Sequence, residues 1–255
     1  MDLLNHLSKS LKELNSTQYN ILYIYSDLRY FGKFKSASTD KQQFLKSIIN
    51  CITLVNKTLI IPTFTYTESG IFDVQKTNTN LGALNSFVLK NYKIDRSEHP
   101  IFSYAAIGEE SNLVKKIGKS AFGSDSIHKR LLNKKTAFLY IGRPVSFGNT
   151  IIHYAEQLLN VDYRFEKYFP TNVYDENKFI ANNYSAFVRK KNNLENDYAF
   201  SFEKAAGILS KQGLIQQINL GYEFSNISIM PYDETFDVLK NLLAQNESIF
   251  LKKPV

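Results

Sequence analysis

His153 and Glu156 are the pair of residues whose types and spacing best suit acid–base chemistry. They stand three positions apart in NTIIHYAE, which has the pattern of a helix beginning near Thr150, so the imidazole and the carboxylate share one helix face. An imidazole titrates near neutral pH and can act as a general base, and a neighbouring carboxylate can orient the ring or steady its developing positive charge. Many helices carry such a pair as a surface ion pair, so the spacing alone favours that structural role.

Other kinds of catalysis find less support in the chain. The remaining histidines are His6, His99 and His128; His6 lies in an amphipathic segment and His128 stands beside Lys129 and Arg130, so both are expected on solvated faces. A zinc site needs a third protein ligand, and no H-E-x-x-H or C-x-x-C spacing occurs, so we predict no metal site. The glycine patterns of hydrolase elbows, phosphate loops and dinucleotide folds are missing from the sequence as well.

The single cysteine, Cys51, lies in the apolar helical stretch FLKSIINCITLV. One cysteine cannot form a disulfide within the chain or a thiolate metal cluster. Its surroundings predict a small buried residue with a packing role.

The turn DLRYFGKFK, after the first apolar strand, places Arg29, Lys33 and Lys35 beside backbone N–H groups that the strand leaves free. Such a turn is a suitable environment for phosphate oxygens. It is equally typical of a basic surface loop, and the local sequence does not choose between the two.

The charge balance favours anionic partners of small size. The formal net charge is +7, from 31 Lys and Arg against 24 Asp and Glu, but the basic residues are dispersed and no DNA- or RNA-binding pattern appears, so we predict no nucleic-acid partner. No apolar stretch reaches the roughly 18 residues of a membrane span, and the N-terminus has the pattern of an amphipathic helix rather than a leader. We therefore expect a cytoplasmic protein without a membrane partner.

The elements that must position these residues alternate in kind, which predicts an α/β fold with a mixed central sheet layered with helices. We expect strands at 20–26, 57–65, 102–108 and 136–142, and helices at 1–16, 41–55, 81–91, 112–120, 126–134 and 148–160. Asp40 suits the N-cap of the second helix, and residues 66–80 have the composition of a long loop.

The tail, residues 161–255, is less regular. It predicts two strands, a helix at 201–213, a strand within 215–230 and a closing helix at 233–246 capped by Asp233. No repeat or linker interrupts the chain, so residues 1–255 are expected to form a single domain.

Several of these segments, in this order, resemble the aminoglycoside 3-N-acetyltransferase-like family, whose members transfer an acetyl group from acetyl-CoA to an amine. The specific pieces are RS-x-HP followed by FSYAAIG at residues 96–108, and NT-x-x-H-x-AE at 149–156, with PTFT at 62–65 in support. The similarity spans roughly residues 20–170, with a looser tail in FEKAAGILSKQGLIQQINLG. It implies an α/β fold of this family, acetyl-CoA as co-substrate, a small amine acceptor and no metal.

The resemblance also implies roles for individual residues. His153 corresponds to the general base and Glu156 to its carboxylate support, while Thr150, or a backbone N–H at the start of its helix, would stabilise an oxyanion. Acetyl-CoA would lie along the turn after the first strand, near the end of the second strand, and against the segment that begins at residue 96. The positions concerned are Ser26, Asp27, Leu28, Arg29, Thr63, Thr65, Arg96, Ser97, His99 and Ser103.

The chain departs from the family at the acetyl-CoA turn. The family reads His-Ser-Ser-Leu there, whereas this chain has Tyr25, Ser26, Asp27 and Leu28. An acidic side chain at this place repels a pyrophosphate unless it faces away. The expected reaction is a direct attack of the amine on the thioester, because the only cysteine is placed in an apolar helix.

The acceptor is the least determined part of this interpretation. Aminoglycosides are polycations that call for carboxylates, whereas this chain is basic and its 66–80 segment carries only Glu68 and Asp73 as acids. We therefore expect an amino sugar linked to a nucleotide or in a surface-polysaccharide precursor. The alternatives are an aminoglycoside 3-N-acetyltransferase that confers antibiotic resistance, a homologue that binds ligand without catalysis, and O-acetylation of a hydroxyl. The sequence leaves open whether the chain works alone or as a homodimer.

Overall fold

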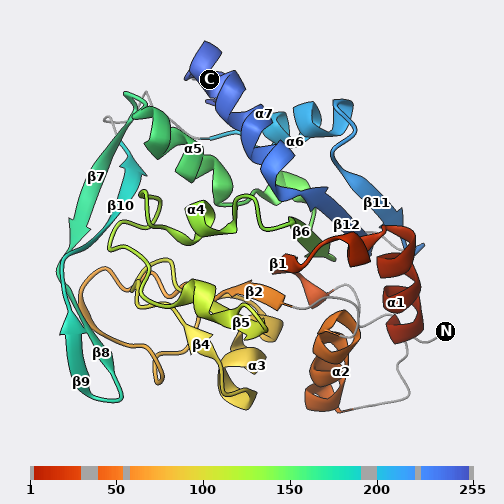
Figure 1. Ribbon diagram of the computed structural model, residues 1–255, viewed down its shortest axis with the longest axis horizontal. Helices are drawn as coiled ribbons and strands as arrows, with labels where there is room; N and C mark the ends of the chain where they lie inside the picture. The colour runs from red at the N-terminus through yellow and green to blue at the C-terminus, as the bar shows by residue number, and fades with distance from the viewer. Residues whose placement is uncertain (1–2, 30–39, 54–57, 191–199, 222–224, 253–255) are drawn as a thin grey trace.

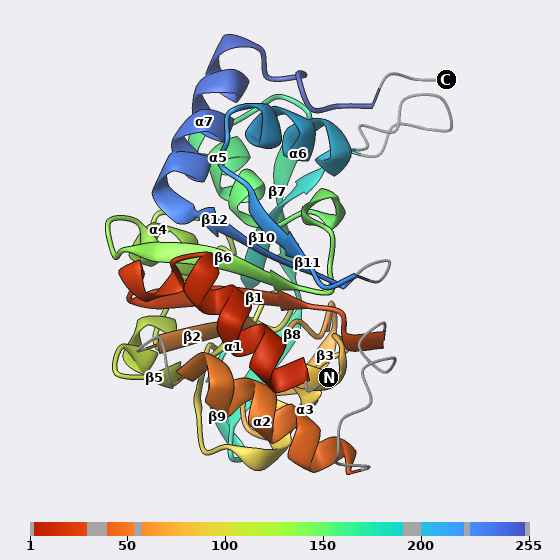
Figure 2. The same cartoon turned by 90° about the vertical axis from the view of Figure 1, so that its right-hand side faces the viewer.

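A computed structural model describes residues 3–29, 40–53, 58–190, 200–221 and 225–252 (Figure 1). A seven-stranded sheet at its centre has the strand order β11–β12–β6–β1–β2–β5–β4, and Figure 2 shows β12, β6, β1, β2 and β5 from top to bottom. The three middle strands are parallel, and those on either side are antiparallel to their inner neighbours, so the sheet is mixed as predicted. The strands are β1 (Ile21–Ser26), β2 (Thr58–Pro62), β4 (Asp95–Arg96), β5 (Tyr104–Gly108), β6 (Thr136–Ile141), β11 (Gln216–Asn219) and β12 (Asn226–Pro231).

The middle strands are apolar throughout because helices cover both faces of the sheet. In β1, Ile21 and Tyr23 belong to one hydrophobic core, whereas Leu22 and Ile24 belong to the other. This alternation follows from the two-residue period of a strand.

The helices divide between these two cores by their place in the sequence (Figure 1). The first three pack on one face: α1 (Leu3–Glu13), α2 (Lys41–Thr53) and α3 (Ala83–Asn91). The last four pack on the other: α4 (Ile127–Leu131), α5 (Ile151–Leu159), α6 (Phe202–Lys211) and α7 (Tyr232–Gln245). The α5 helix, which carries the predicted catalytic pair, thus lies over the same face as α7 and α4.

Two smaller sheets run along one side of the molecule (Figure 1). In one, β7 (Arg164–Phe169) pairs with β10 (Tyr184–Arg189); in the other, β8 (Thr171–Asp175) lies between β9 (Lys178–Ala181) and β3 (Gly70–Asp73). Residues 164–189 thus hold four strands where the tail was predicted to hold two, and the predicted loop at 66–80 contains β3. Its partner β8 lies about a hundred residues further along the chain, which local patterns cannot reveal.

Several element boundaries differ from the predictions. The helix expected at 112–120 is only a 3₁₀ turn at Ser111–Val114. The strand expected at 57–65 ends at Pro62, and 215–230 forms the hairpin of β11 and β12 rather than one strand. Asp40 accepts a hydrogen bond from the Gln42 N–H at 2.8 Å, as expected of a cap. Asp233 is no cap, because α7 begins one residue earlier.

Candidate active site

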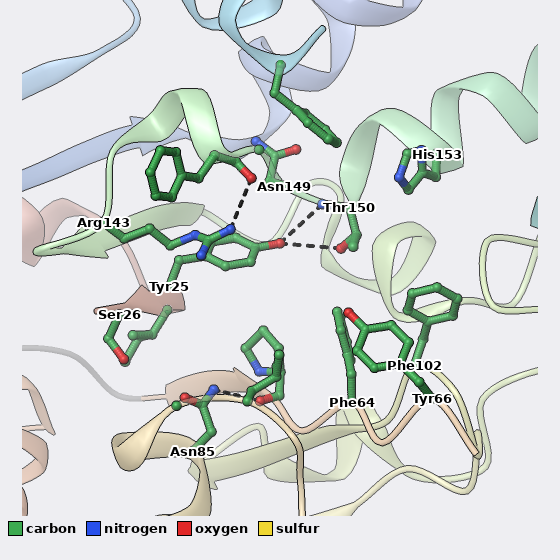
Figure 3. A pocket seen from close by; sticks show the side chains of 17 residues that line it. Tyr25, Ser26, Phe64, Tyr66, Asn85, Phe102, Arg143, Asn149, Thr150 and His153 are labelled. Atoms are coloured by element: carbon green, nitrogen blue, oxygen red, sulfur yellow. Dashed lines mark hydrogen bonds between the residues drawn. The ribbon is translucent and has the colours of Figure 1, made fainter. Parts of the chain in front are cut away.

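A pocket of about 270 Å³ opens at the carboxyl ends of β1, β2 and β6 (Figure 3). Ligands of open α/β sheets bind at this edge, beyond the ends of the parallel strands. Aromatic rings form much of the wall, from Tyr25, Phe64, Tyr66, Phe102, Phe147 and Phe202. The polar groups come from Ser26, Asn85, Arg143, Asn149, Thr150 and His153.

His153 and Glu156 of α5 contact each other as predicted. The imidazole Nδ1 lies 2.6 Å from Glu156 Oε2, and the Glu156 side chain is fully buried while that of His153 is 18% exposed. Because Nδ1–H donates to the carboxylate, the Nε2 lone pair is the group left to act on a bound molecule. Figure 3 shows His153 at one side of the pocket, facing it.

Two residues that the sequence analysis did not identify complete this cluster. Tyr163 donates its hydroxyl to Glu156 Oε1 at 2.8 Å, and Arg164 Nε lies 2.8 Å from Glu156 Oε2. The Arg164 side chain, at the start of β7, is only 8% exposed, and its Nη2 lies 3.0 Å from His153 Nδ1. No local spacing indicates these contacts, because the chain turns from α5 into β7 between the partners.

The cluster keeps the carboxylate charged and the imidazole neutral. Burial lowers the pKa of His153, the positive charge of Arg164 lowers it further, and Glu156 acts in the opposite direction. Burial raises the pKa of Glu156, but His153, Arg164 and the Tyr163 hydroxyl outweigh it, so that this pKa is lowered. At neutral pH His153 is therefore an unprotonated base held by an ionised carboxylate.

Thr150 is the N-cap residue of α5 and lines the same pocket. Its hydroxyl lies 3.1 Å from the Tyr23 hydroxyl, and its backbone N–H donates to the Tyr25 hydroxyl at 3.1 Å. Tyr25 therefore uses the backbone donor that was one of the two predicted oxyanion groups. The other predicted oxyanion group, the Thr150 hydroxyl, also lies 3.4 Å from the Tyr25 hydroxyl and 3.5 Å from that of Tyr104.

The turn after β1 brings only Ser26 to the pocket among the acetyl-CoA residues predicted there. Asp27 is bound by Arg29, whose Nε lies 2.9 Å from Oδ1 and whose Nη2 lies 2.5 Å from Oδ2. This hydrogen bonding lowers the pKa of Asp27. Leu28 packs against the core under α1 and α2. The acidic departure from the family turn is thus neutralised by its neighbour; Lys33 and Lys35 lie outside the described residues.

Arg96, Thr63 and Ser103 form a buried network behind the pocket wall. The Arg96 guanidinium donates to the carbonyl oxygens of Thr63 and Val74 at 3.0 Å each and to the Ser103 hydroxyl at 3.2 Å. Burial lowers the pKa of Arg96 to about 10. These groups tie the chain after β2 to the loop after β3, and they are not among the residues that line the pocket. Their predicted contact with acetyl-CoA stays a prediction.

Ser97, His99 and Thr65 are also buried away from the pocket. The Ser97 hydroxyl accepts a hydrogen bond from the Tyr104 N–H at 2.9 Å, and the Thr65 hydroxyl donates one to the Pro100 carbonyl. His99 Nδ1 accepts two backbone N–H groups, so Nε2–H donates to the Ser185 carbonyl at 2.9 Å. Burial lowers the pKa of His99 to about 4. These polar groups satisfy one another inside the fold, and the segment at 96–108 contributes Phe102 to the wall instead.

His128 is the clearest error in the sequence-based expectations. It is fully buried rather than solvated, its Nδ1 lies 2.7 Å from the Tyr232 hydroxyl, and burial lowers its pKa to about 3. On the short α4 helix the ring of His128 is buried, whereas Lys129 is exposed and Arg130 is half-buried. The two basic neighbours therefore led to the wrong expectation for His128. His6 and Cys51 are half-buried on α1 and α2.

Within the described ranges, two kinds of feature are missing: a metal-binding cluster and a membrane-spanning helix. No three His, Cys, Asp or Glu side chains gather there as a metal-binding group. No described helix has both the length and the apolar character needed to cross a membrane.

A sequence model of the family described as aminoglycoside 3-N-acetyltransferase matches residues 24–244. The chain belongs to this family. Its fold is shared by AAC-IIIb in a binary structure with CoASH (TM-score 0.76, 14% identity, 99% of this chain and 98% of that one). AAC-VIa bound to sisomicin is similar too, with a TM-score of 0.74 and 19% identity over 95% of this chain and 97% of that one. The YokD protein from Bacillus subtilis has a TM-score of 0.69 and 15% identity over 94% of this chain and 99% of that one. A comparison with curated proteins finds no match.

Membership of the aminoglycoside 3-N-acetyltransferase family confirms the resemblance drawn from residues 96–108 and 149–156. The solved structures confirm the α/β fold over nearly the whole chain. At these identities they leave the acceptor and the residue roles to be argued from the pocket itself.

Proposed function

We propose that the chain is an acetyl-CoA-dependent N-acetyltransferase that acts on an amine of an amino sugar. The observation that carries this proposal is the arrangement of His153, with Nδ1 fixed on a buried, ionised Glu156 and the other face of the ring at the pocket. A neutral imidazole so held can take a proton without changing its orientation.

The residues present fit acetyl-CoA at the pocket. The apolar walls suit an extended thioester arm, and the Ser26 hydroxyl with the Asn85 and Asn149 side chains offers polar contacts for its amides. When bound, acetyl-CoA supplies the acetyl group as an activated thioester. Ser26 is the predicted cofactor-binding residue of this turn that lines the pocket, and the ion pair of Asp27 and Arg29 lies next to it in the chain.

His153 performs the proton transfers in this proposal. Its Nε2 removes a proton from the acceptor ammonium group, which frees the nitrogen lone pair for attack on the thioester carbonyl carbon. Thr150 Oγ1 donates a hydrogen bond to the carbonyl oxygen as negative charge develops there. His153 then returns this proton to the departing sulfur as the nitrogen–carbon bond replaces the carbon–sulfur bond. The nitrogen loses a second proton to solvent, so ammonium and thioester give amide, thiol and one released proton.

A covalent acyl-enzyme is not part of the proposal. Cys51 does not line the pocket; it belongs to α2, where its thiol lies 3.9 Å from the Leu4 carbonyl oxygen. Direct transfer within a complex of both substrates follows.

Two acceptor classes are favoured by different observations. Family membership favours an aminoglycoside, and sisomicin is bound by one of the similar structures. The pocket favours a less cationic amino sugar, because Arg143 lines it and none of its described lining residues is Asp or Glu. Turnover of kanamycin-type antibiotics compared with nucleotide-linked amino sugars decides between them; preference for the antibiotic rejects the second class.

Substitution of His153 by Ala tests the proposed base. Loss of general-base catalysis costs about 10²- to 10⁴-fold in turnover, measured by release of the CoA thiol with a panel of amine acceptors. Acetyl-CoA should still raise the melting temperature of the variant, because the proton acceptor is not needed for binding. His6→Ala, on α1 away from the pocket, is the control.

Unchanged turnover in His153→Ala contradicts the role assigned to this residue. Acetyl-CoA stabilisation of the wild type without turnover of any amine or hydroxyl acceptor supports a ligand-binding homologue instead. Transfer to hydroxyls alone supports O-acetylation.

A further inference from the structure

Arg143 is a pocket residue whose hydrogen-bonding capacity is largely unused. It is separated from the end of β6 by Gly142 alone. Its Nη2 donates to the Phe147 carbonyl at 3.0 Å, and its Nε is buried with no hydrogen-bond partner. The rings of Tyr25 and Phe147 lie 5.9 and 5.5 Å from the guanidinium carbon. A guanidinium has five N–H donors. With Nε buried and one Nη2 N–H bound to Phe147, the Nη1 group and the second Nη2 N–H are left for a ligand.

The positive charge of Arg143 also lacks a carboxylate partner among the described pocket residues. Asp27 lies close enough for the charge of Arg143 to help lower its pKa, but both of its oxygens are bound by Arg29. Other arginines of the fold differ: Arg164 is paired with Glu156 at 2.8 Å. The positively charged Arg143 therefore lies on one side of the pocket, and the neutral base His153 lies on the other (Figure 3).

We propose that Arg143 binds a phosphate group carried by one of the two reactants. This inference rests on the proposed function, because it assigns a ligand group to the same pocket. The planar fork matches two oxygens of one anion, and the flanking rings hold it in place. Ser26 lies on the same side of the pocket as Arg143 in Figure 3.

The anion has two possible carriers, which predict different losses in Arg143→Gln. If it belongs to CoA, the variant binds acetyl-CoA about 10- to 100-fold more weakly, while S-acetyl-N-acetylcysteamine, a thioester without phosphate, binds as before. If it belongs to the acceptor, Arg143→Gln binds acetyl-CoA as the wild type does. The variant then binds glucosamine 6-phosphate more weakly by a similar factor, while its affinity for unphosphorylated glucosamine is unchanged.

Calorimetric titration measures these affinities directly, without turnover, so failure of this inference is separate from failure of the proposed catalysis. Arg143→Lys keeps the positive charge but lacks the planar guanidinium, so its affinity for the phosphorylated probe should lie between those of the wild type and Arg143→Gln. Lys9→Gln, an exposed charge on α1, controls for the change in net charge. Affinities of Arg143→Gln within twofold of the wild type for every phosphorylated probe overturn the inference, as does a wild type that binds none of them.

Discussion

Replacing Glu156 by Gln removes one charge from the buried cluster while keeping the shape of the side chain. Gln can still accept the Tyr163 hydroxyl, but Arg164 loses the carboxylate that lies 2.8 Å from its Nε. The Arg164 side chain is 8% exposed and cannot recover this interaction from water. Leaving one partner of a buried ion pair alone costs about 3–5 kcal/mol, which for a chain of this size lowers the melting temperature by roughly 6–20 °C.

A double-mutant cycle tests this reasoning by urea or thermal unfolding. Arg164→Gln should cost less than Glu156→Gln, because His153 can take up a proton and balance the remaining carboxylate. The double variant has no unpaired charge, so it should be more stable than the sum of the single losses predicts, by roughly 2 kcal/mol or more.

The pH dependence provides a second check on Glu156→Gln. The pKa of Glu156 is lowered by folding, so its contribution is present above the ordinary value of 4.5 and is lost as the pH falls through the folded pKa. The stability gap between wild type and variant should therefore shrink in acid. A Glu156→Gln variant within about 1 kcal/mol of the wild type at pH 7, or strictly additive losses in the cycle, refutes the buried ion pair as the support of His153.

Two further predictions concern stability away from the reacting atoms. Folding lowers the pKa of His99 to about 4 and that of His128 to about 3, so the unfolded chain binds more protons than the folded chain in weak acid. The free energy of unfolding, measured in urea, should therefore fall by about 4 kcal/mol between pH 7 and pH 5. The variant His128→Gln should lose only about half as much over this range. An unfolding free energy that is flat over this range contradicts it. Gly148→Ala places a methyl group in the ring of Phe202 at a backbone φ of 86°, so we expect a loss of at least about 2 kcal/mol in thermal unfolding; a variant as stable as the wild type is the contrary result.

The sequence by itself determined the elements that carry strong periodicity. The apolar runs that became β1, β2 and β6 are typical of strands buried on both faces, and the structure places them side by side at the centre of the sheet. The three-residue spacing of His153 and Glu156 was enough to place the two groups in contact, because a helix repeats nearly every fourth residue.

Tertiary structure alone decided which polar groups reach the pocket. Arg96, Ser97 and His99 belong to a family-like segment, yet they bond to buried backbone groups and are not among the residues that line the pocket. Arg164 reaches Glu156 only because β7 returns alongside α5. A position just after a buried parallel strand could have indicated Arg143 as a site residue, but the unpartnered Nε of its guanidinium could not be read from the sequence. Contacts between segments distant along the chain depend on how the layers pack, and local patterns do not encode that packing.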